Sequence, residues 1–245
     1  MLDSMDVQQT YRLVFAWLNN NQGVLALTIF VITLILGWVS GIFSALRRKP
    51  KFKIDTIEGP TYCCTYLTGD VHEGFDVHRT GIVIYLSIVN IGSSASSIRR
   101  ISVGYHWHLH PFSVLWVRNT LGWFWLTHQA VALEDFQVRI GDSIKIYPFL
   151  TQINSLSPSQ NNTYLEAGSG TNGVVYFEQP DSWGGCFPSI RNGKVKVKVR
   201  VEDVFGGHHT KSIWIRAVSF EEARKFNPSF GATLASLRGE PGTYQ

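Results

Sequence analysis

One long uncharged apolar stretch divides the pattern of hydrophobic and polar residues along this chain. Residues 23–46 carry no charged side chain and are dominated by Leu, Ile, Val and Phe. A helix of this length is about 36 Å long, which is enough to cross a hydrocarbon core of about 30 Å. Helices buried in soluble proteins rarely run so far without a polar face. The pattern therefore predicts a single transmembrane helix over 23–46.

A second apolar period of helical spacing precedes this stretch. Within residues 7–20 the apolar side chains recur three or four positions apart, at Val7, Tyr11, Val14, Phe15 and Leu18. The extracytoplasmic segment 1–22 is therefore predicted to hold a short amphipathic helix on the membrane surface. The alternative is a poorly ordered terminus.

Beyond residue 53 the apolar period changes from helical to alternating. Short runs rich in Val, Ile, Tyr, Phe and Thr are separated by Gly, Asn, Pro and Ser, which is typical of an antiparallel β-sandwich. The predicted domain covers 54–230, and the strand–turn–strand text at 88–98 resembles that of immunoglobulin-like sandwiches. Segment 82–90 is apolar on both faces and is predicted to be a central strand. The predicted strands are 52–57, 61–67, 82–90, 98–109, 131–140, 143–149, 173–178, 194–202 and 210–215.

One short helix is expected near the end of the domain. Ser219 and Glu222 form a capping box before FEEARKF, and Asn227-Pro228 ends the helical pattern. The tail 231–245 has little apolar content and is expected to be flexible. The fold class is thus mainly β, with one transmembrane helix and a short C-terminal helix.

The net charge of +4 is concentrated beside the apolar stretch. The linker 47–53 contains five cations, whereas the domain itself is close to neutral, so no nucleic-acid partner is expected. Cytoplasmic flanks carry the excess of Lys and Arg, which predicts a single-pass protein of the cell (inner) membrane with its N-terminus outside. The cations predicted to attract anionic lipid headgroups are Arg47, Arg48, Lys49, Lys51 and Lys53.

Small residues recur every fourth position within the predicted transmembrane helix. Gly37, Gly41 and Ala45 give a stripe that allows close helix packing, so the chain is either a homo-oligomer or a lone anchor with incidental glycines.

Three cysteines, two of them adjacent at Cys63 and Cys64, fit a reducing compartment better than a disulfide framework.

Three histidines alternate in the sequence HWHLH. On a strand, His106, His108 and His110 would share one face, where a divalent ion could bind. No carboxylate or thiol follows closely enough to complete the ligand set. The alternative is a half-exposed strand face carrying amphipathic rings.

The segment 105–126 is unusually aromatic and contains Arg118 as its one fixed charge. Segments of this kind belong either in a core or at an interface between apolar and aqueous phases. We expect residues 112–126 to dip into the inner leaflet or to contact a partner protomer, with core filling as the alternative. The candidate interface residues are Trp116, Trp123, Phe124 and Trp125.

A second alternating segment separates valines from cations. Lys194, Lys196, Lys198 and Arg200 fall on one face of the strand 194–202, where they could hold an anionic ligand such as a nucleotide or a lipid headgroup. The alternative is a solvated face whose charges prevent edge-to-edge association.

No segment combines a nucleophile with its base, and no cofactor motif fits its required structural context. The sequence therefore predicts no catalytic residues and no cofactor. The expected function is a binding, scaffolding or sensor module at the inner membrane face, with membrane lipids and an unidentified protein as partners. Two alternatives are a ligand-triggered membrane-disrupting effector, as in bacterial defence, and a metal-dependent enzyme using the three histidines.

Overall fold

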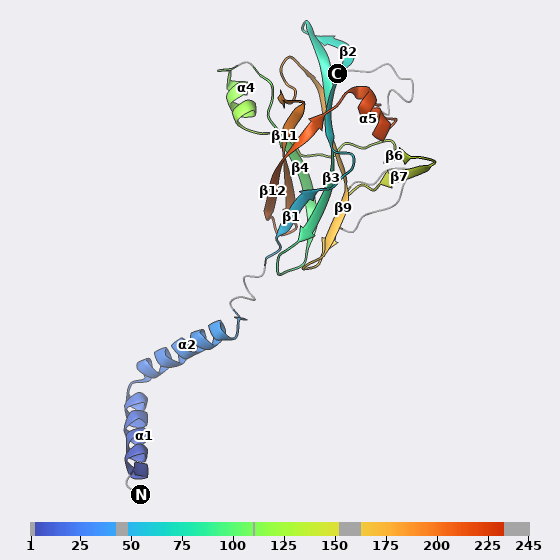
Figure 1. Cartoon of the computed structure of the whole chain (residues 1–245). Coiled ribbons are helices and arrows are strands. Elements are labelled where there is room, and N and C mark those ends of the chain that lie inside the picture. The colour runs from blue at the N-terminus through green and yellow to red at the C-terminus, as the bar shows by residue number, and fades with distance from the viewer. Residues whose placement is uncertain (1–2, 43–48, 110, 152–162, 233–245) are drawn as a thin grey trace. The chain divides into compact units, whose positions relative to one another are not determined.

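The computed structural model describes residues 3–42, 49–109, 111–151 and 163–232, without the side chains of residues 3–10 and 18. The chain forms two compact units, residues 1–49 and 50–245. The first is helical, and the second contains all the described strands (Figure 1).

Two helices form the first unit. Helix α1 (Asp3–Asn20) and helix α2 (Gln22–Val39) are separated at Asn21, whose φ of −118° and ψ of 62° are not helical. Among the described helices, α2 alone is long and apolar enough to cross a membrane, with a mean hydropathy of 2.2 and no buried residue. Its Thr28 and Thr33 hydroxyls each donate a hydrogen bond of 2.8 Å to a carbonyl one turn earlier, so neither requires a solvent partner.

Helix α2 ends earlier than the sequence predicts. The backbone N–H of Gly41 donates to the carbonyl of Trp38 at 3.1 Å, three residues back instead of four, and Gly41 has a φ of 75°, in the left-handed region that favours glycine. Gly37 and Gly41 therefore do not lie on one continuous helical face, and Ala45 is outside the described residues. Helix packing through this stripe stays a prediction.

Twelve strands are present in the described part of the second unit. Each of the nine predicted segments contains a strand, but 98–109 ends early, at Tyr105, and β5, β8 and β10 were not predicted. The strands are β1 (Phe52–Thr56), β2 (Tyr62–His72), β3 (Phe75–Asn90), β4 (Ser96–Tyr105), β5 (Phe124–Leu126), β6 (Phe136–Ile140), β7 (Ser143–Tyr147), β8 (Tyr164–Leu165), β9 (Gly170–Trp183), β10 (Ile190–Arg191), β11 (Lys194–Asp203) and β12 (His208–Ala217).

Ten of these strands pair in one strongly curved sheet, and β6 and β7 form a separate hairpin. The main path runs β1-β3-β2-β12-β11-β4-β5, with β9 on the other edge of β3, and all pairs are antiparallel except β2 with β12. Its two halves enclose a core that receives residues from β1, β3, β4, β9, β11 and β12. The predicted mainly β sandwich is confirmed, whereas its immunoglobulin-like character stays a prediction.

Strand β3 is buried on both faces, as its double apolar pattern predicts. Ile82, Ile84 and Leu86 point into the core between the sheet halves, whereas Val83 and Tyr85 belong to a second cluster on the opposite face. The hairpin β6–β7 and helix α5 (Phe220–Phe226) contribute to that second cluster. The central strand is therefore covered by a third layer.

The predicted C-terminal helix is also confirmed. The Ser219 hydroxyl accepts a hydrogen bond of 3.2 Å from the backbone N–H of Glu222, as a capping box requires. The helix packs on the sheet through the fully buried Ala223, whose carbonyl accepts a bond of 3.3 Å from the Tyr62 hydroxyl.

The buried side-chain amide of Asn90 makes hydrogen bonds to the backbone next to the start of the sheet. The Asn90 side chain donates to the carbonyls of Ser94 and Leu165, at 2.8 and 3.1 Å. Its oxygen accepts from the backbone N–H groups of Gly92 and Lys51, at 3.0 and 3.3 Å. Asn90 thereby ties the β3–β4 turn to the residue that precedes β1.

We expect Asn90→Ala to lower the free energy of unfolding by roughly 2–4 kcal/mol, because buried backbone groups lose their partners. Chemical denaturation of the full chain in neutral detergent would measure this. Ile91→Ala, a change at the exposed neighbouring position, is the matched control and should cost less than about 1 kcal/mol. Equal effects of the two changes would contradict the role of Asn90.

A cationic and aromatic face as a candidate anion-binding site

Strand β11 separates its side chains cleanly between the core and the surface. Val195, Val197 and Val199 are at most 1% exposed inside the sandwich. The alternating residues Lys194, Lys196, Lys198 and Arg200 therefore lie on the outer face. The strand pairs with β12 and β4 along most of its length, so it is not a sheet edge. Protection against edge-to-edge association thus does not explain these cations.

The unpredicted strand β5 brings a tryptophan onto this face. Strand β5 pairs with β4 so that Trp125 lies opposite Gly104. A Cβ atom on Gly104 would come within 3.0 Å of the indole ring, so the absence of a side chain allows the ring to lie flat on the sheet. The Arg200 guanidinium is 3.7 Å from the centre of the Trp125 ring, which is a cation–π contact.

Trp123 lies beside two lysines of the row and one of the predicted metal-site histidines. The Lys198 and Lys196 ammonium groups are 5.3 and 6.0 Å from its ring centre. The His106 ring contacts the same indole in a tilted arrangement, with ring centres 4.1 Å apart. The predicted anion-binding cations and two of the predicted interface tryptophans thus form one surface, which we call the cationic face.

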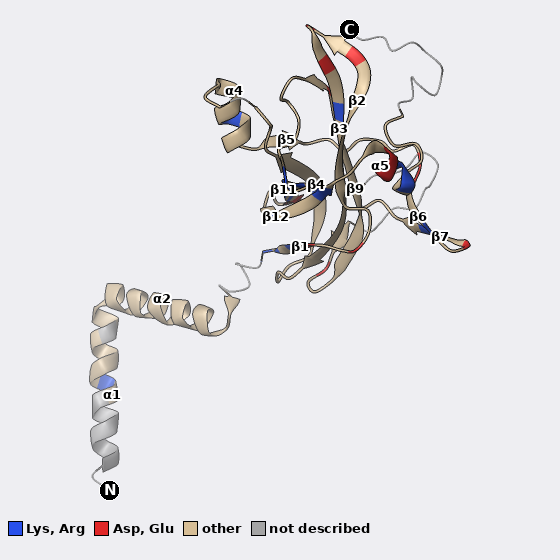
Figure 2. Cartoon of the chain, turned by 45° about the horizontal axis from the view of Figure 1, so that its top comes forward, with Lys and Arg blue, Asp and Glu red and all other residues tan. Residues whose placement is uncertain are grey.

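The cations of this face are not neutralised by the described acids. The nearby carboxylates of Glu202 and Glu222 pair with Arg99 and Arg216, at 2.9 and 3.2 Å, rather than with the β11 row. Figure 2 shows Lys and Arg gathered on β11. Alternate residues of a strand are about 7 Å apart, so neighbouring cations repel by about 0.6 kcal/mol in bulk water. An anion bound here would relieve that repulsion.

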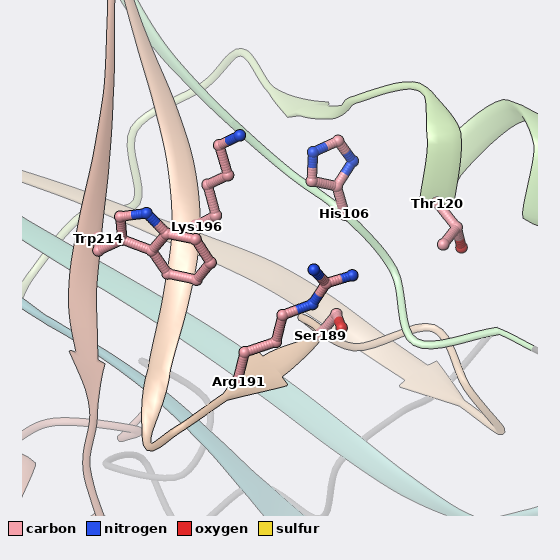
Figure 3. A pocket seen from close by; sticks show the side chains of 6 residues that line it. All are labelled: His106, Thr120, Ser189, Arg191, Lys196 and Trp214. Carbon is pink, nitrogen blue, oxygen red and sulfur yellow. The ribbon is translucent and has the colours of Figure 1, made fainter.

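A small pocket opens at one end of the cationic face. It has a volume of about 170 Å³, which suits a phosphate-sized group better than a complete drug-sized ligand. The Arg191 guanidinium reaches toward His106, with the half-exposed ring of Trp214 on the opposite side (Figure 3). The pocket is lined by His106, Thr120, Ser189, Arg191, Lys196 and Trp214, and none of these is an acid.

The proton on His106 can be placed from its hydrogen bond. Its Nδ1 atom lies 2.6 Å from the carbonyl oxygen of Gly122. Because a carbonyl only accepts, Nδ1 carries the proton in this contact. The Nε2 atom is therefore the ring nitrogen left to interact with a ligand.

The remaining aromatic residues of 105–126 do not share one role. Phe124 and Trp107 pack against the core, with ring centres 4.4 Å apart. Trp116 lies in the following loop and stacks on Phe112 at 5.7 Å. The stretch is thus divided between core, cationic face and an exposed loop, so neither of the two sequence-based alternatives describes all of it.

The predicted histidine triplet is not assembled in the described residues. Strand β4 ends at Tyr105, so strand alternation does not continue through 106–110. His106 contacts Trp123, whereas His108 stacks on Phe187 with ring centres 5.3 Å apart, and His110 is outside the described residues. No group of three His, Cys, Asp or Glu residues within the described ranges could hold a metal ion.

The juxtamembrane cations are only partly described. Arg47 and Arg48 lie outside the described residues, whereas Lys49, Lys51 and Lys53 are exposed. Asp55 accepts from Lys211 at 3.0 Å and pairs with Lys53 at 3.3 Å, and these contacts lower the pKa of its carboxyl group. Lys53 is therefore shared between solvent and the domain surface.

The two adjacent cysteines offer no ready nucleophile. Cys63 and Cys64 are buried free thiols. Burial raises the pKa of Cys64 to about 12 and raises that of Cys63 further. Both thiols therefore stay protonated at neutral pH, when a reactive cysteine would be a thiolate.

Four of the six pocket residues were not predicted from the sequence, namely Thr120, Ser189, Arg191 and Trp214. A hairpin signal was available for Arg191, because Asn192-Gly193 forms a two-residue turn that pairs Arg191 with Lys194. Trp214 alternates with the inward-facing residues of β12, but its position opposite Lys196 depends on the pairing of β12 with β11.

Comparison with known proteins gave no relative from which to transfer a function. No protein-family model matches the chain, and no curated protein matches it in sequence. The geometry of the cationic face is therefore the basis for a functional proposal.

Replacement of adjacent aromatic residues should separate the core from the cationic face. We expect Phe124→Ala to lower the free energy of unfolding by about 2–4 kcal/mol, because it leaves a cavity at the core. Trp123→Ala should cost only about 1–2 kcal/mol, since it removes cation–π contacts from a half-buried site. Chemical denaturation followed by near-UV circular dichroism would measure both. A larger loss for Trp123→Ala would place that ring in the core.

Proposed function

We propose that this protein is a membrane-anchored binding module whose β-sandwich holds a phosphate-bearing anion on the cationic face. Helix α2 is the proposed anchor, and the domain that follows it is proposed to lie in the cytoplasm at the inner membrane face. The protein thus acts by keeping a recognition event at the membrane rather than by catalysis. A soluble phosphate ligand and a lipid headgroup share the chemistry that this surface would recognise.

The observation that carries the ligand proposal is the combination of unpaired cations with exposed or half-exposed indoles around one acid-free pocket. Arg191 and Lys196 supply positive charge, and the planar guanidinium group of Arg191 can donate two parallel hydrogen bonds to phosphate oxygens. Trp214 supplies an apolar surface beside that charge. Small-ligand sites commonly combine such a surface with a few convergent polar groups.

The membrane proposal rests on the length and composition of α2. Its 18 residues span about 27 Å as a helix, close to the thickness of the hydrocarbon core. Acidic Asp3 and Asp6 precede it, whereas five cations lie within 47–53, and this asymmetry supports a cytoplasmic domain.

The two alternative functions receive less support. A metal-dependent enzyme would need the three histidines together, and the two that are described contact different aromatic rings. A membrane-disrupting effector that assembles through Gly37 and Gly41 would need both on one helical face, and Gly41 lies beyond the end of α2.

The proposed ligand chemistry can be tested by calorimetric titration of the full chain in neutral detergent. Inorganic pyrophosphate serves as the soluble probe, and mixed micelles containing phosphatidylserine serve as the lipid probe. We expect binding of at least one probe to weaken as salt increases, because salt screens exposed charges. Lys196→Gln combined with Lys198→Gln should weaken that binding by at least about tenfold, as expected for lost charged hydrogen bonds.

The control is Lys225→Gln, on an exposed lysine of α5 away from the cationic face. It should leave binding unchanged. Binding of pyrophosphate alone would identify a soluble ligand, and binding of phosphatidylserine alone would identify a headgroup. Absence of both, or equal binding by the double variant, would overturn the proposed ligand site.

The proposed anchor and its orientation predict a separate outcome. After alkaline carbonate washing, the full chain should stay in the membrane pellet, because α2 is held by the hydrocarbon core. A protease added outside intact cells should leave the domain undigested. Release by carbonate would refute the membrane span, and digestion from outside would refute the orientation alone.

A further inference from the structure

An exposed apolar loop stands beside the cationic face. Residues 111–121, here called the apolar loop, contain the short helix α4 (Val114–Trp116) and the π-helical turn η1 (Val117–Leu121). Five of its large apolar side chains are between 50% (Leu115) and 90% (Phe112) exposed, and Trp116 is partly buried. The exposed set is Phe112, Val114, Leu115, Val117 and Leu121. Several such side chains on one projection are typical of an interaction surface.

The base of the loop is held firmly, so the exposure is not a consequence of loose packing. The backbone N–H of Trp107 donates to the carbonyl of Asn119 at 2.9 Å. The Thr120 hydroxyl donates to the carbonyl of Trp107 at 2.8 Å. Phe112 has a φ of 70°, a backbone conformation that bulky residues rarely adopt and that concentrates at functional sites.

The charges around the apolar loop indicate which surface would cover it. Arg118 is the sole fixed charge between Arg100 and Glu134 in the sequence, so the loop has no acid of its own. Thr120 lines the same pocket as Arg191 and Lys196, which places the loop next to the cationic face. Apolar side chains beside unpaired cations complement a membrane surface, where acyl chains lie below anionic headgroups.

We propose that the apolar loop inserts into the leaflet of the membrane that α2 anchors, while the adjacent cationic face contacts anionic headgroups. This inference rests on the anchor proposed above. It makes the membrane surface itself the partner of the domain, with Phe112 and Val114 as the leading side chains.

The length of the chain before the domain allows this contact. The loop lies at the opposite end of the sandwich from the start of β1, and α4 can be seen standing off the sheets at that end in Figure 1. The ten residues of β4 cover about 34 Å between the two ends. Twelve residues separate Val39 from Phe52, which gives a reach of at most about 40 Å. The tether is therefore long enough for the domain to lie along the bilayer.

Depth-dependent quenching tests the proposal in the full chain reconstituted into phosphatidylcholine–phosphatidylserine liposomes. An environment-sensitive fluorophore is attached at Phe112→Cys in a Cys186→Ser background, since Cys63 and Cys64 are buried. The control is Ile144→Cys, which replaces another exposed apolar residue, on β7. We expect brominated lipids to quench the label at 112 at least twofold more than the label at 144.

One double variant and one change of lipid composition make the test specific. Leu115→Asp with Val117→Asp should abolish the excess quenching at 112, while an unchanged melting temperature shows that the domain stays folded. Omission of phosphatidylserine should reduce the quenching by at least half. Equal quenching at 112 and 144 would overturn the proposal. Energy transfer between 112 labels without lipid quenching would also overturn it, because a second copy would then cover the loop.

The experiments distinguish a failure of the proposed anchor from a failure of the proposed loop insertion. Protein that resists carbonate washing but shows no excess quenching at 112 retains its membrane span and lacks the proposed insertion. Protein that carbonate releases has lost the anchor on which the inference rests.

Discussion

The rest of the domain depends on one constraint: the valines of β11 fill the interior of the sandwich. Val195, Val197, Val199 and Val201 meet residues of β1, β3, β4 and β9 in one core. Since successive side chains of a strand point to opposite faces, this burial commits every alternate residue of β11 to the outer surface. A register slip of one residue would place lysines in the core, which the cost of burying charge forbids. The cationic row is therefore held in place by the same packing that stabilises the fold.

Regular alternation made most of the fold predictable. The strands with clear apolar periods were found, and so were the central position of β3 and the cap of α5 at Ser219. The strand β5 was missed because Phe124–Leu126 is uniformly apolar and too short to show a period. Strand β4 was predicted too long, because alternation in the letters of HWHLH continues after the backbone pairing has ended at Tyr105.

The candidate site was harder to predict, since its parts come from separate segments of the sequence. The cations of β11 and the tryptophans near β5 were each recognisable, but their contact depends on β4 lying between the two strands. That pairing is a long-range property that local periodicity does not contain. Gly104 illustrates the limit: the sequence shows a glycine in a strand, whereas the structure shows a ring lying on it. The exposure of residues 111–121 is likewise visible only once the sheets are assembled.

The ties at the start of β1 have a mechanical consequence. Asn90 accepts the backbone N–H of Lys51, and the His209 ring accepts that of Phe52 at 3.2 Å. Tension applied through the residues that precede β1 would reach these two bonds first and then the five paired residues of β1 on β3. Because β1 pairs with the last five residues of β3, a pulling force would pass from β1 into a strand that is itself paired with β2 and β9. The start of the domain is thus secured by two side chains as well as by strand pairing.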